Sequence, residues 1–154
     1  MMSMNRVFRN KPLITGCVLV MLVILVAIFA PHLSIHDPYE MNFDSRLELP
    51  SKSHWLGTDN FGRDLWSRIA LGTRVSAIIA ILSVSVSAIL GTLVGLYAGY
   101  KGGWFDLVIM RIVDIFLGFP VLILALALVA ALGPGVKNIV IALIFVYWGR
   151  FTRI

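Results

Sequence analysis

The chain has 154 residues, 59% of them apolar, and a mean hydropathy of +0.92, which excludes an ordinary soluble globule and favours one membrane-embedded domain. The formal net charge of +5 is scattered, with no basic run interleaved with aromatic residues, so we expect no nucleic acid partner. The single cysteine, Cys17, excludes an internal disulfide and indicates nothing about the redox compartment.

The first apolar run, Leu13 to Ala30, follows a basic segment, Met1 to Lys11, and predicts a transmembrane helix. A cleaved signal peptide is the alternative, because it also joins a basic start to an apolar run. The run exceeds the usual apolar region of about 7 to 15 residues, and Ile28-Phe29-Ala30 lacks a small residue three positions before a cleavage point. We therefore expect an uncleaved membrane anchor.

The segment from Pro31 to Lys52 contains prolines and acidic residues without helical or strand periodicity, and it predicts an irregular connection outside the membrane. His32 and His36 are four residues apart, so on a helix they could bind a metal from one face. Prolines on both sides disfavour such a helix, and we favour two solvated loop histidines.

A polar island, His54 to Ser76, lies between the strongly apolar stretches and mixes charges, aromatic residues and glycines. A solvated loop and a short amphipathic helix at the bilayer surface both fit this mixture. In the second case, Gly57-Thr58-Asp59-Asn60 would form a turn and helix N-cap, and Gly72 would end the helix.

The next apolar run, Ser76 to Gly99, predicts the second span because Tyr97 is its only ionisable side chain. Small residues recur in it every four positions: Ser83, Ser87, Gly91, Gly95 and Gly99. Small side chains let helices approach closely in lipid, so we expect a helix-packing face. The alternative is the ordinary glycine content of membrane helices.

Tyr100 to Asp106 predicts a short turn around Gly102-Gly103, and Ile115 to Leu132 predicts the third span. Arg111 and Asp114 are three residues apart on one helix face, and we favour a structural ion pair there over a functional relay.

Pro120 should kink the third span near Gly118. Gly133-Pro134-Gly135 predicts a tight turn before a fourth span from Val136 to Ile154. We therefore expect an all-α, polytopic transmembrane bundle with residues 1–75 as an anchor and amphipathic segment and residues 76–154 as part of a transmembrane domain.

The order of glycines and charges in the polar island resembles a signature of permease subunits in the dipeptide, oligopeptide and nickel group of ATP-binding-cassette importers. The matching residues are Leu56, Gly57, Thr58, Asp59, Gly62, Arg63, Asp64, Ser67, Arg68, Gly72, Thr73, Arg74, Val75 and Ser76. Further matches are Gly99, Tyr100, Gly102, Gly103, Asp106, Met110, Arg111, Asp114, Phe119, Pro120, Leu132, Gly133, Asn138, Trp148 and Arg153. The resemblance runs from Asn10 onward.

This resemblance implies a second, C-type permease of the bacterial cytoplasmic membrane, with about four of six expected spans present. It implies a second permease subunit, two ATP-binding subunits and an extracytoplasmic substrate-binding protein as partners, and peptides or nickel as substrate. Lysine and arginine divide almost evenly between the two sides, so their distribution does not decide the orientation. The cluster of Arg6, Arg9 and Lys11 before the first span favours a cytoplasmic N-terminus, and the resemblance places Met1 to Lys11 in the cytoplasm and Pro31 to Arg74 outside.

The sequence contains no phosphate-binding loop, no plausible catalytic triad and no Cys/His cluster with metal spacing, so we expect no enzyme activity, cofactor or metal. The chain stops before the Glu-Ala-Ala coupling loop that the resemblance implies, and we expect a fragment or a truncated copy. Two alternatives are a small membrane scaffold and a piece of a secondary transporter, whose functional ions would be Arg111 and Asp114.

Overall fold

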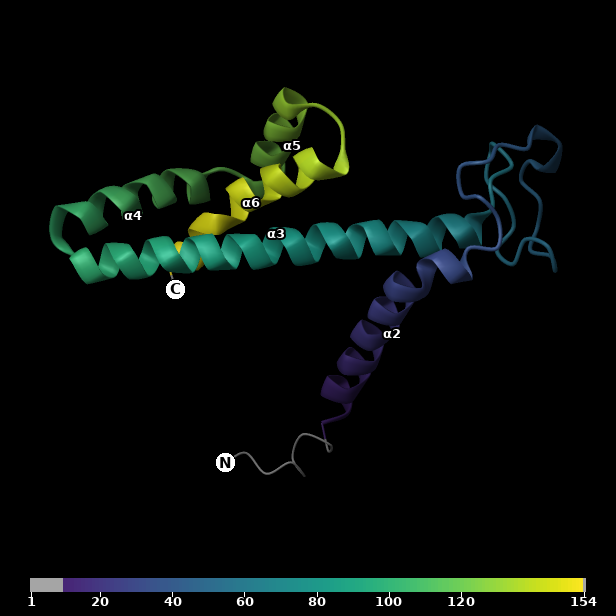
Figure 1. The fold of residues 1–154 in the computed structure, drawn as a ribbon, viewed down its shortest axis with the longest axis horizontal. Coiled ribbons are helices and arrows are strands. Elements are labelled where there is room, and N and C mark those ends of the chain that lie inside the picture. Colours follow the sequence, from purple (N-terminus) through teal and green to yellow (C-terminus); the bar gives the residue numbers. More distant parts are fainter. Residues whose placement is uncertain (1–9, 154) are drawn as a thin grey trace. The chain divides into compact units, whose positions relative to one another are not determined.

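The computed structural model describes residues 10–153, which form helices and loops without a β-strand. The five α-helices are α2 (Lys11–Leu33), α3 (Leu65–Lys101), α4 (Gly103–Gly118), α5 (Val121–Leu132) and α6 (Val136–Thr152), with a 3-10 turn, η1, at Phe43–Ser45 (Figure 1). This confirms the all-α prediction. The chain divides into two compact units, Met1–Ala77 and Ile78–Ile154, which are described separately.

Two helices in the described residues, α2 and α3, are each long and apolar enough to cross a membrane. The α4 and α5 helices meet this standard only as a pair, and they are bent by 92°. Residues 10–153 therefore contain two such helices, or up to three spans if the bent pair counts as one, where the sequence predicted four. The fourth candidate, α6, has 17 residues in the described part of the chain.

The break between α4 and α5 lies at Pro120, where the sequence predicted a kink within one helix. Phe119 has an extended backbone, with φ −87° and ψ 140°, because the proline ring disfavours helical geometry in the residue before it. Pro120 also lacks the N–H that would continue the ladder of hydrogen bonds. The interruption predicted at Pro120 is therefore present, but it is a break between two helices and not a kink within one.

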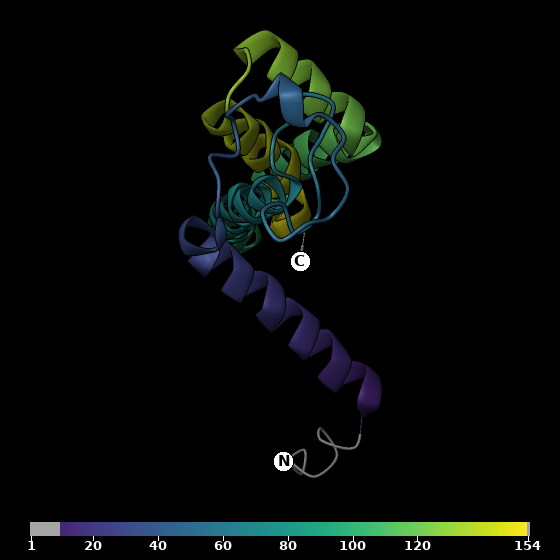
Figure 2. The ribbon, with the colours of Figure 1, turned by 90° about the vertical axis from the view of Figure 1, so that its right-hand side faces the viewer.

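In the first unit, α2 continues through Pro31 and ends at Leu33, slightly beyond the predicted end. The connection to α3 is irregular apart from η1, as predicted, and it folds back on itself (Figure 2). Backbone hydrogen bonds join its two arms: Asn42 N donates to Phe61 O (3.1 Å), Leu47 N to Asp59 O (3.2 Å) and Thr58 N to Glu48 O (3.1 Å). These bonds give the connection a defined shape.

The α3 helix passes through Gly72 without interruption, so the separate surface helix ending at that residue is wrong. Gly72 does not adopt the positive φ of a helix-ending glycine. A glycine inside a helix costs only about 1 kcal/mol relative to alanine, which the helical residues on both sides outweigh. With 37 residues, α3 is roughly 55 Å long, more than the hydrocarbon core of about 30 Å requires.

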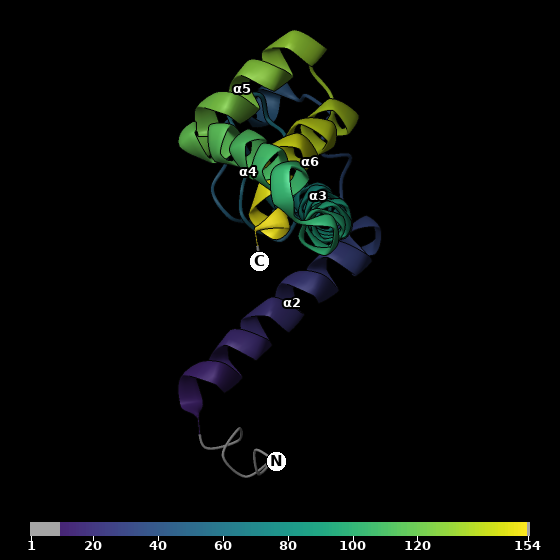
Figure 3. The ribbon, with the colours of Figure 1, turned by 90° about the vertical axis from the view of Figure 1, so that its left-hand side faces the viewer.

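In the second unit, α6 packs against both α4 and α5 (Figures 1 and 3). Phe116 of α4 contacts two aromatic rings of α6, Phe145 and Trp148, with ring centroids 5.1 and 5.8 Å apart. The predicted glycine turns are present: Gly102 and Gly103 have φ values of 59° and 61° between α3 and α4. This turn reverses the direction of the chain between α3 and α4 (Figure 1).

Candidate functional site

Seven residues of the polar island form a compact group that we call the signature cluster: Gly57, Thr58, Asp59, Gly62, Arg63, Asp64 and Arg68. Asp59 is its centre. One carboxylate oxygen accepts hydrogen bonds from the backbone N–H groups of Phe61 (2.8 Å) and Arg63 (3.1 Å). The other accepts from the Arg63 guanidinium, with Nη2 at 2.7 Å and Nε at 2.8 Å, and lies 3.7 Å from Arg68 Nε. Asp59 thus holds the loop and two cations together.

The surroundings of Asp59 keep it ionised. Burial raises the pKa of the carboxyl group, but the hydrogen bond from Arg63, the two backbone donors and the Arg63 charge outweigh burial and lower the pKa to about 2. A charge-assisted, two-point contact of this kind fixes orientation as well as energy. We infer that this ion pair sets the shape of the turn at any physiological pH.

The glycines of the cluster allow two arms of the connection to approach closely. Gly57 and Gly62 have φ values of 76° and 74°, which L side chains rarely adopt. A Cβ atom at Gly62 would overlap the Asn42 carbonyl group, and one at Gly57 would overlap the Glu48 carbonyl oxygen. Both positions therefore require glycine for conformation and for space.

Thr58 joins the same two arms through its side chain. Its hydroxyl group is buried, donates a hydrogen bond to Ser45 O and accepts one from Glu48 N at 2.9 Å. Thr58 and Asp59 were predicted to cap a helix, but the structure places them in the turn before it. The cap is Asp64.

Asp64 caps α3 because its Oδ2 atom accepts a hydrogen bond from Ser67 N at 2.8 Å. Burial raises the pKa of Asp64, but hydrogen bonds from Ser67 and His54 outweigh burial and lower the pKa below its ordinary value. Ser67 Oγ in turn accepts from His36 N at 3.2 Å. This chain of contacts attaches the start of α3 to the segment that follows α2.

Two more side chains of α3 reach the same segment. Trp66 Nε1 donates to Leu33 O at 2.8 Å, and Arg68 Nη1 donates to Pro38 O at 3.1 Å. Seven residues of the matched signature stay outside the cluster: Leu56, Ser67, Gly72, Thr73, Arg74, Val75 and Ser76. Leu56, Arg74 and Ser76 are exposed, and Arg74 makes no ion pair within residues 10–153.

In the second unit, most of the small-residue stripe of α3 lies against α6. Ser83 and Ser87 are buried, and Ser87 Oγ donates to Ile144 O at 3.3 Å. A Cβ atom at Gly91 would overlap the Trp148 carbonyl oxygen, and one at Gly95 would overlap that of Thr152. Backbone therefore packs on backbone along these turns.

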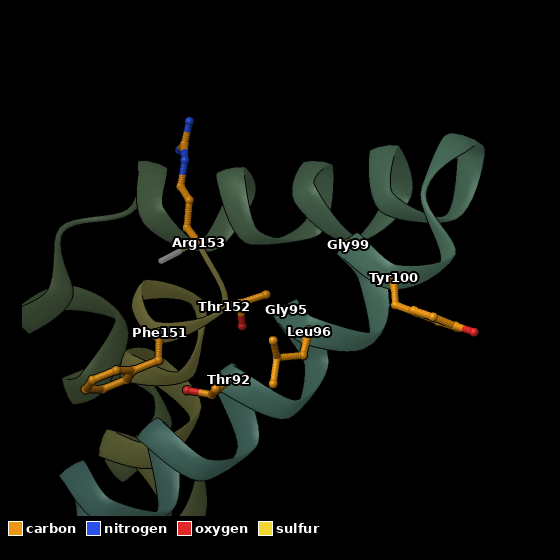
Figure 4. Close-up of a pocket in the computed structure, with 8 residues that line it drawn as sticks. All are labelled: Thr92, Gly95, Leu96, Gly99, Tyr100, Phe151, Thr152 and Arg153. Atoms are coloured by element: carbon orange, nitrogen blue, oxygen red, sulfur yellow. The ribbon is translucent and has the colours of Figure 1, made fainter.

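Gly99, the last residue of the stripe, has no atom within 4 Å of a Cβ position. It lines a cavity of about 510 Å³ between the C-terminal ends of α3 and α6 (Figure 4). The cavity is lined by Thr92, Gly95, Leu96, Gly99, Tyr100, Phe151, Thr152 and Arg153. Helix packing thus ends one turn before the stripe does.

Asp114 pairs with Arg153, whose Nη1 lies 2.8 Å from Asp114 Oδ1, and the expected pair with Arg111 is absent from the described residues. The spacing of three residues permitted the expected pair, but α6 packs beside α4 and presents Arg153 to the same carboxylate. The ion pair is a link between helices and not one within α4.

Two family models match the chain. The model for the binding-protein-dependent transport system inner membrane component matches residues 91–154, and that for the N-terminal TM domain of oligopeptide transport permease C matches residues 2–50. The chain is 45% identical to the dipeptide transport system permease protein DppC of Alkalihalophilus pseudofirmus over 94% of its own length and 49% of that protein. The chain belongs to this permease family.

Two further permeases are 41% identical to the chain. The probable D,D-dipeptide transport system permease protein DdpC of Escherichia coli matches over 95% of the chain and 49% of its own length. The glutathione transport system permease protein GsiD of Pectobacterium atrosepticum matches over 97% of the chain and 50% of its own length. The chain thus spans about half the length of the curated relatives it matches.

The permease family consists of membrane transport components and not enzymes, and the apolar helices agree with a multi-pass membrane protein. Ser67 was placed in the matched signature of this permease chain, but its role as the partner of the Asp64 cap was missed. That role had a signal, because Ser67 lies three residues after Asp64, the spacing of a cap and its first free N–H. The contacts of Trp66 with Leu33 and of Arg68 with Pro38 were also missed, because their acceptors are backbone carbonyl groups, which leave no mark in the sequence.

Proposed function

We propose that this chain forms part of a C-type permease subunit in a binding-protein-dependent importer of peptides in the bacterial cytoplasmic membrane. One observation carries the proposal: identity of 41 to 45% with peptide permeases extends over almost the whole chain. The signature cluster supports it, because the matched glycines and charges are in contact with one another in the first unit.

In this proposal the two units have different tasks. Residues 1–75 anchor the subunit and hold the extramembrane turn in shape through Asp59, Arg63 and Asp64. Residues 76–154 contribute helices to the translocation pathway. The stripe of Ser83, Ser87, Gly91, Gly95 and Gly99 supports this role, because close helix packing is the main source of stability between helices in lipid.

The proposed partners are a second permease subunit, two ATP-binding subunits and an extracytoplasmic substrate-binding protein. Much apolar surface supports such an assembly, since Leu90, Leu93 and Leu126 are 46%, 59% and 68% exposed in the single chain. Lipid or neighbouring helices must cover these side chains. The proposed orientation places Pro31 to Arg74 outside, facing the binding protein.

The proposed substrates are di- or oligopeptides, because dipeptides and glutathione are named for the relatives described above. Nickel was the other substrate implied by the resemblance, and it is named for none of these three. A small scaffold and a secondary transporter are the alternatives, and the uptake experiment described next separates the secondary transporter from the proposed importer subunit.

The test is deletion of the reading frame that contains this chain, followed by uptake assays in intact cells with labelled dipeptides, oligopeptides and Ni²⁺. We expect ATP-dependent peptide uptake to fall and to return with a plasmid copy of the frame, while Ni²⁺ uptake stays unchanged. A copy with Asp59→Asn and Arg63→Gln serves as a variant of the signature cluster, and one with Lys52→Gln as an exposed control.

Unchanged peptide uptake after deletion would contradict the proposed function. Loss of Ni²⁺ uptake alone would assign the chain to nickel import. Peptide uptake that depends on a proton gradient instead of ATP would favour a secondary transporter.

A further inference from the structure

We propose that His36, His54 and Asp64 form a binding site for a divalent transition-metal ion, with Zn²⁺ as the expected occupant. The sequence pointed to His32 and His36 as the only metal candidate and favoured loop histidines instead. The structure places His32 at the end of α2 and brings His36 together with two residues from other segments. One ligand atom from each of the three lies within 4.8 Å of the other two.

The distances suit a shared ion. His54 Nδ1 lies 3.0 Å from Asp64 Oδ1. Ligand atoms around tetrahedral zinc, with bonds of about 2.0 to 2.1 Å, are about 3.3 Å apart, so these two atoms need to separate by only a few tenths of an ångström. The His36 and His54 rings lie with centroids 4.7 Å apart and planes tilted by 32°. Both imidazoles therefore reach one point beside the carboxylate.

The site contains an atom that lacks a partner. His36 Nδ1 is buried and makes no hydrogen bond to any of residues 10–153. A buried polar atom without a partner costs free energy, and an unprotonated imidazole nitrogen is a good zinc ligand. A metal ion bound through this nitrogen would give it a partner, and the ion would replace the His54–Asp64 hydrogen bond with two metal bonds.

Ser67 holds two of the ligand residues in place. Asp64 is 3% exposed, and its Oδ2 atom is fixed by Ser67 N while Oδ1 remains beside His54. Ser67 Oγ accepts from His36 N, so one serine positions two of the three ligand residues. Such outer contacts are typical of metal sites and orient the residues that bind the ion.

The space around the three residues is sufficient for an ion and further ligands. They line a cavity of about 220 Å³ with Asp37, Glu40, Asn42 and Gly62. A water molecule occupies about 30 Å³ of liquid, so water or a neighbouring carboxylate can fill the fourth position of a tetrahedral site. Two imidazoles favour zinc over Ca²⁺ and Mg²⁺, which prefer oxygen ligands.

The three ligand residues come from separate places in the first unit: His36 from the start of the irregular connection, His54 from its later part, and Asp64 from the cap of α3. An ion held by all three would tie these parts together, and it would stabilise the folded chain as its concentration rises above the dissociation constant. The role is structural, and it is independent of which substrate the importer carries.

The test uses the full chain, purified in detergent with a tag that lacks histidine and stripped with a chelator. Dialysis against Zn²⁺ followed by elemental analysis should give about one zinc per chain, and Co²⁺ should give the visible absorption bands of a tetrahedral site. Zinc should bind His36→Gln and His54→Gln more than about tenfold more weakly. His32→Gln, an exposed histidine near the same loop, should bind as the original chain does.

Zinc should also raise the unfolding temperature of the original chain and of His32→Gln, but not of the other two variants. Absence of bound zinc in the original chain would overturn the proposal even if a variant failed to fold, and would leave His54 and Asp64 as a hydrogen-bonded pair. Equal zinc binding by the original chain and by the double variant His36→Gln, His54→Gln would overturn it as well. Neither result bears on peptide uptake, so this proposal and the proposed function fail separately.

Discussion

Replacement of Gly95 by leucine should destabilise the second unit because no room exists for a side chain between α3 and α6. A Cβ atom at Gly95 would lie 3.2 Å from Thr152 Cα and closer still to its carbonyl oxygen. Carbon atoms in contact normally lie about 3.5 to 4.0 Å apart, so even the first carbon of the new side chain requires the helices to separate.

The magnitude follows from two losses. Forcing extra carbons into a packed contact costs about 1 to 3 kcal/mol. Separation of the helices also removes the hydrogen bond from Ser87 to Ile144 O, and such contacts in membrane proteins average about 0.6 kcal/mol. We therefore expect Gly95→Leu to lower the free energy of unfolding by about 2 to 4 kcal/mol.

Two matched controls make this test specific. Gly99→Leu makes the same change in the same stripe, but nothing lies within 4 Å of the new Cβ, so the chain should tolerate it. Leu93→Ala removes a side chain that is 59% exposed and should also have little effect.

Unfolding in mixed micelles, followed by tryptophan fluorescence as denaturing detergent is added, measures all three variants. Equal tolerance of Gly95→Leu and Gly99→Leu would refute the reasoning, and would reduce the stripe to the ordinary glycine content of a membrane helix.

Three further predictions concern the first unit. The pKa of Asp59 is about 2 in the fold and 3.8 ordinarily, so its ion pair should stabilise the fold above pH 4 and lose that effect as the pH falls from about 4 to 2; Asp59→Asn should remove this part of the pH dependence of unfolding. Gly62→Ala should destabilise the chain by more than about 1 kcal/mol, because Gly62 has a positive φ and its Cβ would overlap the backbone of Asn42. Gly72→Ala, inside α3 with open space around it, should be neutral or stabilising in the same assay. Ser51→Cys, with Cys17 replaced by serine, should react with an impermeant thiol reagent on intact cells, and labelling only after the membrane is opened would reverse the proposed orientation.

The fold could be predicted from the sequence wherever a property of a few neighbouring residues determines the local structure. The apolar runs that become α2 and α3, and the glycines at 102, 103, 133 and 135, could be predicted because hydrophobicity and positive φ act within a few residues. The sequence was insufficient at Gly72 and Pro120, where one residue type is compatible with two outcomes. A glycine can end a helix or lie within it, and a proline can bend a helix or break it.

The site was harder to predict than the helices because its contacts join distant parts of the chain. Asp114 had a plausible partner three residues away, yet Arg153 binds it after α6 packs beside α4. His36 and His54 lie in an irregular connection whose course depends on backbone carbonyl groups, which every residue has. Only the pattern of glycines and charges in the signature, known through resemblance, pointed to the region.

The 92° break between α4 and α5 limits what can surround it in a membrane. Gly118, Phe119 and Pro120 are all exposed in the single chain, and the carbonyl groups of a helix end need hydrogen-bond donors. Hydrocarbon offers none, so unwound backbone at bilayer depth is tolerated only against protein or beside water. If α4 and α5 together form one span, the break must therefore border another helix or a hydrated channel, and a spin label at Phe119 should be more accessible to a water-soluble relaxation agent than one at Leu126.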